Sequence, residues 1–195
     1  MLELKQGLLN TSRNFRGGNM VKKNLGIIFT GILLVTVVFF YFYNSEELYG
    51  NDKDSIVKVI QSIEGYETKQ IEILKINDFN KVRIVGFLSN SNPSYIEFHK
   101  NEEGNYVWKH IESKNDESFS LFLSSVEGSK MMFVTNNNNK IAEMHVEING
   151  NTLERKFTPH KASVTWIDMP QTNKDSYEFR NYKYYDKGGN LIKNN

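Results

Sequence analysis

The chain has 195 residues and a mass of 22.7 kDa, with 39% hydrophobic and 24% charged residues, which suits one or two small folded units. Its net charge of +1 argues against a dedicated nucleic-acid-binding protein, because such proteins usually carry a strong basic excess. The absence of cysteine excludes a disulfide framework, a thiolate metal site and a cysteine nucleophile.

Residues 25–43, LGIIFTGILLVTVVFFYFY, form a stretch of nineteen residues without a charge. A helix of this length rises by roughly 28 Å, close to the hydrocarbon thickness of a bilayer. Basic residues dominate before the stretch and acidic residues after it, so the positive-inside rule places the N-terminus in the cytoplasm. The stretch predicts a single-pass signal anchor in the cell membrane, with the C-terminal part extracytoplasmic. A buried core helix is the alternative.

The chain is therefore expected to divide into five parts. Met20 opens a short basic sequence that is typical of a signal-anchor start, so Met20 is an alternative start to Met1. The five predicted parts are a cytoplasmic tail at 1–24, the transmembrane signal anchor at 25–43, a linker at 44–51, a helix plus antiparallel sheet at 52–125 and a β-sandwich-like region at 126–195. One continuous sheet folded over one helix is the competing architecture for the last two parts.

A short helix is predicted directly after the linker. Asp52 or Asp54 can cap its start and Gly65 is a plausible stop. Its apolar face is predicted to carry Ile56, Val57, Ile60 and Ile63. After residue 66 the pattern changes to short strands separated by turn residues. The predicted fold class is α+β and mainly antiparallel β, with the helix packed on a sheet.

Two hairpins can be predicted with their registers. Within 95–111, a loop at 102–104 would pair Phe98 with Trp108 in an aromatic core, and Lys100 with Tyr106. The same register places Glu97 opposite Lys109 on a charged surface.

The second hairpin turns at Asn149-Gly150, the dipeptide that favours a type I′ turn. Pairing outward from the turn sets Val146 against Leu153 and Ala142 against Phe157 on one face. Opposite-charge and His–Glu pairs form the other face: Glu143 with Lys156, and His145 with Glu154. Further strands are expected at 119–125, 130–135, 163–169 and 177–185.

The helix-then-hairpins order, the Asn-rich turn before 140–150 and the ending 185–192, YDKGGNLI, carry a resemblance. In these features the chain resembles small, membrane-anchored extracytoplasmic proteins of Gram-positive bacteria. The resemblance implies a location and a style of fold, and it implies no activity.

Two pairs of residues are candidates for catalysis. Ser55 and Lys58 match a Ser-x-x-Lys motif, but the further motifs that penicillin-recognising enzymes need do not occur here. His145 opposite Glu154 could orient a general base, but the sequence places no nucleophile beside it. We therefore expect no catalytic residue, no cofactor site and no metal site.

The last strand offers a different kind of site. Aromatic side chains on a rigid sheet can present a contact surface to a partner, and the alternative is that they pack in the core. The candidate partner-binding residues are Tyr177, Phe179, Tyr182, Tyr184 and Tyr185.

The favoured function is a non-catalytic binding or structural module of the cell envelope. Its expected partners are the membrane that anchors it and another envelope protein or a wall component, with no nucleic acid. The alternatives are an envelope hydrolase, which would use one of the two catalytic pairs, and an immunity or stress-response protein at the membrane surface.

Overall fold

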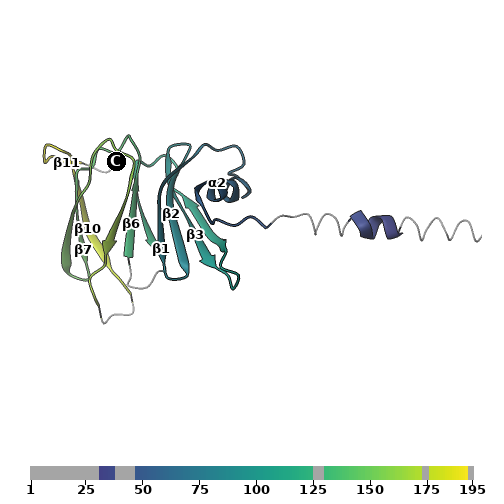
Figure 1. Cartoon of the computed structure of the whole chain (residues 1–195). Helices are drawn as coiled ribbons and strands as arrows, with labels where there is room; N and C mark the ends of the chain where they lie inside the picture. The colour runs from purple at the N-terminus through teal and green to yellow at the C-terminus, as the bar shows by residue number, and fades with distance from the viewer. Residues whose placement is uncertain (1–30, 38–46, 125–129, 173–175, 193–195) are drawn as a thin grey trace, which may run out of the picture. The chain divides into compact units, whose positions relative to one another are not determined.

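The structure is a computed structural model, and it describes residues 31–37, 47–124, 130–172 and 176–192 (Figure 1). The chain divides into two compact units, Met1–Glu47 and Leu48–Asn195.

In the first unit, residues 31–37 are helical, and Thr36 Oγ1 donates a hydrogen bond to the carbonyl oxygen of Ile32 at 2.8 Å. The rest of the predicted span, 25–30 and 38–43, lies outside the described residues, as does the predicted tail at 1–24. These seven helical residues rise by only about 10 Å. Nowhere in the described ranges is a helix long and apolar enough to cross a bilayer. This finding contradicts the predicted single-pass anchor and the predicted cell-membrane localisation with an extracytoplasmic C-terminal part.

The second unit begins with the predicted helix, α2 (Lys53–Gln61). Asp52 is its N-cap: Asp52 Oδ1 accepts a hydrogen bond from the Ser55 amide, and Ser55 Oγ accepts one from the Asp52 amide, both at 2.9 Å. This reciprocal capping box satisfies two amides that the first turn would otherwise leave unpaired. Val59, rather than the predicted Val57, lies in the core with Ile56 and Ile60, because positions three and four apart share a helix face.

The strands of the second unit form three antiparallel sheets, which confirms the α+β, mainly antiparallel β class. Sheet A has the order β1-β2-β3-β4, sheet B the order β5-β6-β9, and sheet C the order β11-β10-β7-β8. The strands are β1 (Ile71–Phe79), β2 (Val82–Ser89), β3 (Asn92–Lys100), β4 (Tyr106–Ser113), β5 (Phe119–Ser124), β6 (Lys130–Thr135), β7 (Glu143–Ile148), β8 (Asn151–Lys156), β9 (Ser163–Asp168), β10 (Phe179–Tyr185) and β11 (Leu191–Ile192).

The helix and the three sheets stack as successive layers, with an apolar cluster between each pair (Figure 1). Strand β6 of sheet B contributes to two of these clusters. Its Met132 and Val134 pack with sheet A, while Met131 and Phe133 pack with sheet C, and all four are at most 1% exposed. Sheet B is therefore buried on both faces. The predicted boundary between 52–125 and 126–195 runs through it, because β5 precedes the boundary and β6 and β9 follow it.

Two residues of β2, Gly86 and Arg83, determine how sheet A packs against its surroundings. Gly86 of β2 faces sheet B so closely that an added Cβ atom would lie 2.4 Å from Cγ2 of Val164 in β9. Arg83, also in β2, holds the chain where it enters the unit: its Nη1 donates to the carbonyl oxygens of Gly50 and Asn51, each at 2.8 Å. Its guanidinium also bonds both carboxylate oxygens of Asp78, at 2.6 and 2.8 Å.

The hairpin at Asn149-Gly150 has the predicted register. Both turn residues have positive φ, at 50° and 83°, as a type I′ turn requires. The predicted pairs are present: Glu143 with Lys156, His145 with Glu154, Val146 with Leu153, and a backbone hydrogen bond between Ala142 and Phe157.

The hairpin of β3 and β4 is confirmed only near its turn. Phe98 pairs with Trp108 and Lys100 pairs with Tyr106, but Glu97 pairs with His110 and not with Lys109. A bulge at Lys109 shifts the register by one residue there. Trp108 is 40% exposed, so the predicted aromatic core at this pair is wrong for its indole ring.

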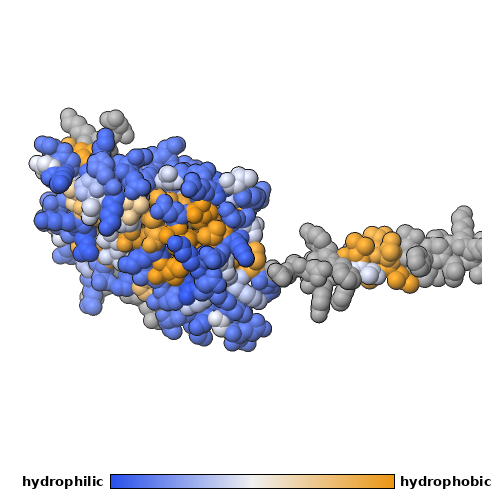
Figure 2. Space-filling view, turned by 45° about the horizontal axis from the view of Figure 1, so that its top comes forward, coloured by the Kyte–Doolittle hydropathy of each residue, from blue (hydrophilic) through white to orange (hydrophobic). Residues whose placement is uncertain are grey.

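On the face of the second unit that Figure 2 shows, hydrophilic residues predominate and apolar residues gather mainly near the centre.

Candidate functional site on the outer face of sheet C

Sheet C is the last layer of the stack, and its outer face carries the residues of the site. Along β7 the side chains alternate, so Met144, Val146 and Ile148 are buried while Glu143, His145 and Glu147 are not. In the described part of the chain, none of the three apolar clusters lies on this outer face. The outward side chains of β7 are partly exposed.

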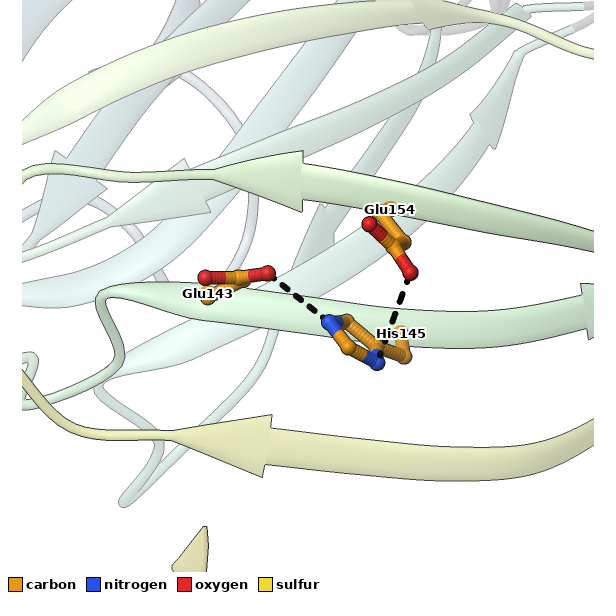
Figure 3. Close-up of side chains that lie close together, drawn as sticks. All are labelled: Glu143, His145 and Glu154. Atoms are coloured by element: carbon orange, nitrogen blue, oxygen red, sulfur yellow. Dashed lines mark hydrogen bonds and ion pairs between the residues drawn. The ribbon is translucent and has the colours of Figure 1, made fainter. Parts of the chain in front are cut away.

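His145 lies between two carboxylates on this face (Figure 3). Its Nε2 is 2.8 Å from Glu143 Oε1, and its Nδ1 is 3.9 Å from Glu154 Oε1. The fold explains the arrangement: Glu143 and His145 are two residues apart on one strand, and Glu154 is the cross-strand partner of His145 on β8. The side chains of His145 and Glu143 are 28% and 33% exposed and that of Glu154 is 62% exposed, so all three remain accessible. We call these residues the His145 cluster.

The neighbours of the His145 cluster come from β10 and β8. The ring of Tyr185 lies with its centroid 4.9 Å from that of His145 and is tilted by 52°. Lys183 pairs with His145 in register, and Lys156 pairs with Glu143. A shallow depression beside the cluster is lined by His145, Val146, Glu147, Thr152, Asn181 and Lys183.

A second depression adjoins the cluster where β7 begins and β8 ends. Glu143 belongs both to the His145 cluster and to this depression. The depression is lined by Ala142, Glu143, Lys156, Phe157, Thr158, Pro159, His160, Asp186, Lys187 and Gly189.

The geometry does not favour either catalytic pair. Both ring nitrogens of His145 face carboxylates, and within the described ranges no hydroxyl group is shown hydrogen-bonded to this ring. A general base of this kind activates a side-chain nucleophile only when that group lies within hydrogen-bond reach, and none of the described hydroxyl groups is bonded to His145. The hydroxyl of Ser55 takes part in the capping box of α2, where it also donates to the Asp52 carbonyl oxygen at 3.0 Å.

The five predicted partner-binding aromatics are divided between the two faces of sheet C. Tyr177, Phe179 and Tyr184 pack against the core between sheets B and C, with the Tyr184 ring 5.5 Å from that of Phe119. Burial raises the pKa of the Tyr184 hydroxyl. Tyr185 lies on the outer face beside His145.

A bulge in β10 determines where the ring of Tyr182, the fifth predicted partner-binding aromatic, lies. The register of β10 against β7 shifts between Arg180 and Lys183, and Asn181 there has φ of 55°. Because of this extra residue, the Tyr182 ring stacks between those of Phe179 and Tyr184, at centroid distances of 6.5 and 6.2 Å. Tyr182 is 37% exposed, and partial burial raises its pKa.

A second group of ionisable residues lies on β3 and β4. His99 Nε2 is 2.6 Å from Glu97 Oε1, whose side chain is only 10% exposed. Tyr95 lies nearby, and its burial, followed by the charges of Glu112 and Glu97, raises its pKa to about 12. Tyr95 packs on Phe122 of sheet B at 4.9 Å, so this group belongs to the packing between sheets A and B.

The contact between Glu143 and His145 was not predicted. Glu143 was expected to pair with Lys156 alone, although residues two apart on a strand share a face. The signal was present as Glu-x-His on β7, followed by Glu154 at the matching position across a well-determined turn.

Comparisons with models of protein families, with curated proteins and with solved structures found no match to this chain. The resemblance to proteins of Gram-positive bacteria therefore stays a prediction.

Proposed function

We propose that the Leu48–Asn195 unit is a non-catalytic binding module and that it contacts a partner protein through the outer face of sheet C. The observation that carries the proposal is the partly exposed outer face itself, with His145 held between two carboxylates at 2.8 and 3.9 Å. A sheet whose other face is buried fixes the backbone positions from which such groups project, and fixed positions favour recognition of one partner.

The chemistry of the face indicates the kind of partner. Three acidic and three basic side chains occupy outward positions on β7, β8 and β10, so their charges balance. These residues are Glu143, Glu147, Glu154, Lys156, Arg180 and Lys183. Interspersed charges suit the mixed surface of another protein and give no long-range attraction to a polyanion. The Tyr185 ring adds an amphipathic contact of the kind enriched in protein interfaces.

Site-specific photo-cross-linking in cells that express the full chain tests this proposal. A photoreactive phenylalanine analogue at Thr152, which pairs with Glu147 and shares the outer face, should give a discrete cross-linked product. The same analogue at Lys109, an exposed residue of β4 in sheet A, is the matched control and should give none. Equal cross-linking at both positions, or none at Thr152, would contradict the proposal.

The hydrolase alternative is tested separately by His145→Ala. Loss of a hydrolytic activity in this variant, with the unit still folded, would replace the binding proposal by the catalytic one. Under the binding proposal, Ser55→Ala weakens the cap of α2 and does not change partner cross-linking from Thr152.

We further infer that sheets B and C form a β-sandwich-like region, as expected for the C-terminal part. The aromatic cluster between them supports this inference: the Phe119 ring lies 4.9 Å from that of Phe157 and 5.3 Å from that of Phe133. The angle between the strands of the two sheets in an experimental structure is the test, and a value near the aligned class of about 30° is expected.

A further inference from the structure

The His145 cluster has the composition of a metal site, and we infer that Glu143, His145 and Glu154 bind a divalent transition-metal ion, with Zn²⁺ as the probe of choice. The inference goes beyond the proposed binding function and does not depend on it. One donor atom from each of the three residues can be chosen so that all three lie within 4.8 Å of one another.

The ligand types fit such an ion. One imidazole nitrogen with two carboxylate oxygens is a donor set that zinc and related divalent metals accept, whereas calcium and magnesium prefer oxygen donors alone. Zinc sites that bind an exchangeable ligand keep three protein donors and leave one position open. On the outer face of sheet C, that position would point to solvent.

Because an ion binds one nitrogen of the ring, and Glu143 and Glu154 contact different nitrogens, the geometry requires a small movement of Glu143 and a larger one of Glu154. Donor atoms at about 2.0–2.2 Å from a zinc ion lie roughly 3.2–3.6 Å apart in a tetrahedral site. The 2.8 Å separation of His145 Nε2 and Glu143 Oε1 would therefore open by a few tenths of an ångström. Glu154 must approach from across the hairpin, and its 62% exposed side chain has the freedom to rotate toward the ion.

The fold also holds the first two ligands steady. Glu143 and His145 belong to β7, the strand of sheet C whose alternate residues are fully buried. Tyr185 packs against the imidazole ring at 4.9 Å and limits its reorientation. Lys183 and Lys156, which pair with His145 and Glu143, bring positive charge near the ion and lower the affinity. The site should therefore bind zinc reversibly and release it to a strong chelator.

Zinc titration of the full chain tests the inference, with a chromophoric zinc chelator as competitor. The wild type should bind one Zn²⁺ per chain, and Glu143→Gln, His145→Ala and Glu154→Gln should each weaken binding by at least about tenfold. Glu147→Gln is the matched control, since Glu147 lies on the same face of the same strand and outside the cluster. It should bind zinc as the wild type does.

A second measurement separates ligand loss from unfolding. Zinc should raise the melting temperature of the wild type and of Glu147→Gln, because an ion that binds only the folded state stabilises it. At the same zinc concentration it should raise the melting temperature of Glu143→Gln by less, while circular dichroism shows that this variant is folded. Equal zinc affinity in all variants, or no zinc binding by the folded wild type, would overturn the inference. Cross-linking from Thr152 is measured without zinc, so the two proposals fail independently.

Discussion

Replacing Gly86 by alanine should destabilise the unit, because sheet A has no room for a methyl group there. The new Cβ atom would lie 2.4 Å from Cγ2 and 3.3 Å from Cγ1 of Val164, and 3.5 Å from Cγ2 of Val134. Carbon atoms pack best at about 3.5–4.0 Å, so β2 or β9 must move by about 1 Å. Overpacking of this kind costs about 1–3 kcal/mol, although alanine in a strand is otherwise favoured over glycine by about 0.5–1 kcal/mol.

A double-mutant cycle attributes this cost to one contact. Val164→Ala removes both atoms that lie closest to the new methyl group, and alone it should cost about 1–2 kcal/mol for the lost burial. In Gly86→Ala/Val164→Ala the methyl group that replaces the Gly86 hydrogen occupies the space that the Val164 side chain vacates. The double variant should therefore lose about 1–2 kcal/mol less free energy of unfolding than the two single variants lose together.

Urea unfolding followed by circular dichroism measures all four free energies of the cycle. The control pair is Val164→Ala with Gly150→Ala, at the distant hairpin turn of sheet C, which should be additive. The reasoning is refuted if Gly86→Ala is as stable as the wild type, or if its cost simply adds to that of Val164→Ala.

Three further predictions test other parts of the structure. Arg83→Met removes all the hydrogen bonds of the guanidinium while it keeps an apolar stem, and it should lower the free energy of unfolding by about 2–3 kcal/mol in a urea titration. The hydrogen bond from Arg83 lowers the pKa of Asp78, so the contribution of Asp78 to the free energy of unfolding is present above pH 4 and is lost as the pH falls through the lowered pKa. The difference in stability between the wild type and Asp78→Asn should therefore vanish in acid. Gly150→Ala should cost about 1 kcal/mol by thermal unfolding, because φ at this residue is 83°, whereas Gly188→Ala, at a glycine without positive φ, should not show this backbone cost.

Turn chemistry made the hairpins the most predictable part of the fold. Asn149-Gly150 determined the register of β7 and β8, and through it the contact between His145 and Glu154. The other hairpin was predictable only up to Lys109, because a bulge leaves no signal in the alternation of side chains near it. The side-chain directions in β10 could not be predicted for the same reason, because the bulge at Asn181 directs the Tyr182 ring toward those of Phe179 and Tyr184.

The stacking of the three sheets was beyond the sequence. Alternation identifies a strand with one buried face, but β6, KMMFVT, is apolar at nearly every position because both of its faces are covered. The sequence gives no indication of which sheets cover it. The predicted membrane span rested on the length of the uncharged stretch and on the charges that flank it, and the described residues contain no helix that supports it. For the site, Glu143 was assigned to its cross-strand lysine because the contact two residues along the strand was not considered.

The order in which the layers are completed follows from the path of the chain. Helix α2 and sheet A come from one continuous segment, Lys53 to Ser113, so they can assemble as soon as that segment leaves the ribosome. Sheet B must wait for β9, and β7 and β8 of sheet C are synthesised before it. A chain that terminates prematurely after β9 would lack β10 and leave the apolar side of β7 partly uncovered. During synthesis the protein thus passes through a stage in which α2 and sheet A can be folded while apolar residues of sheets B and C are still exposed and prone to aggregation.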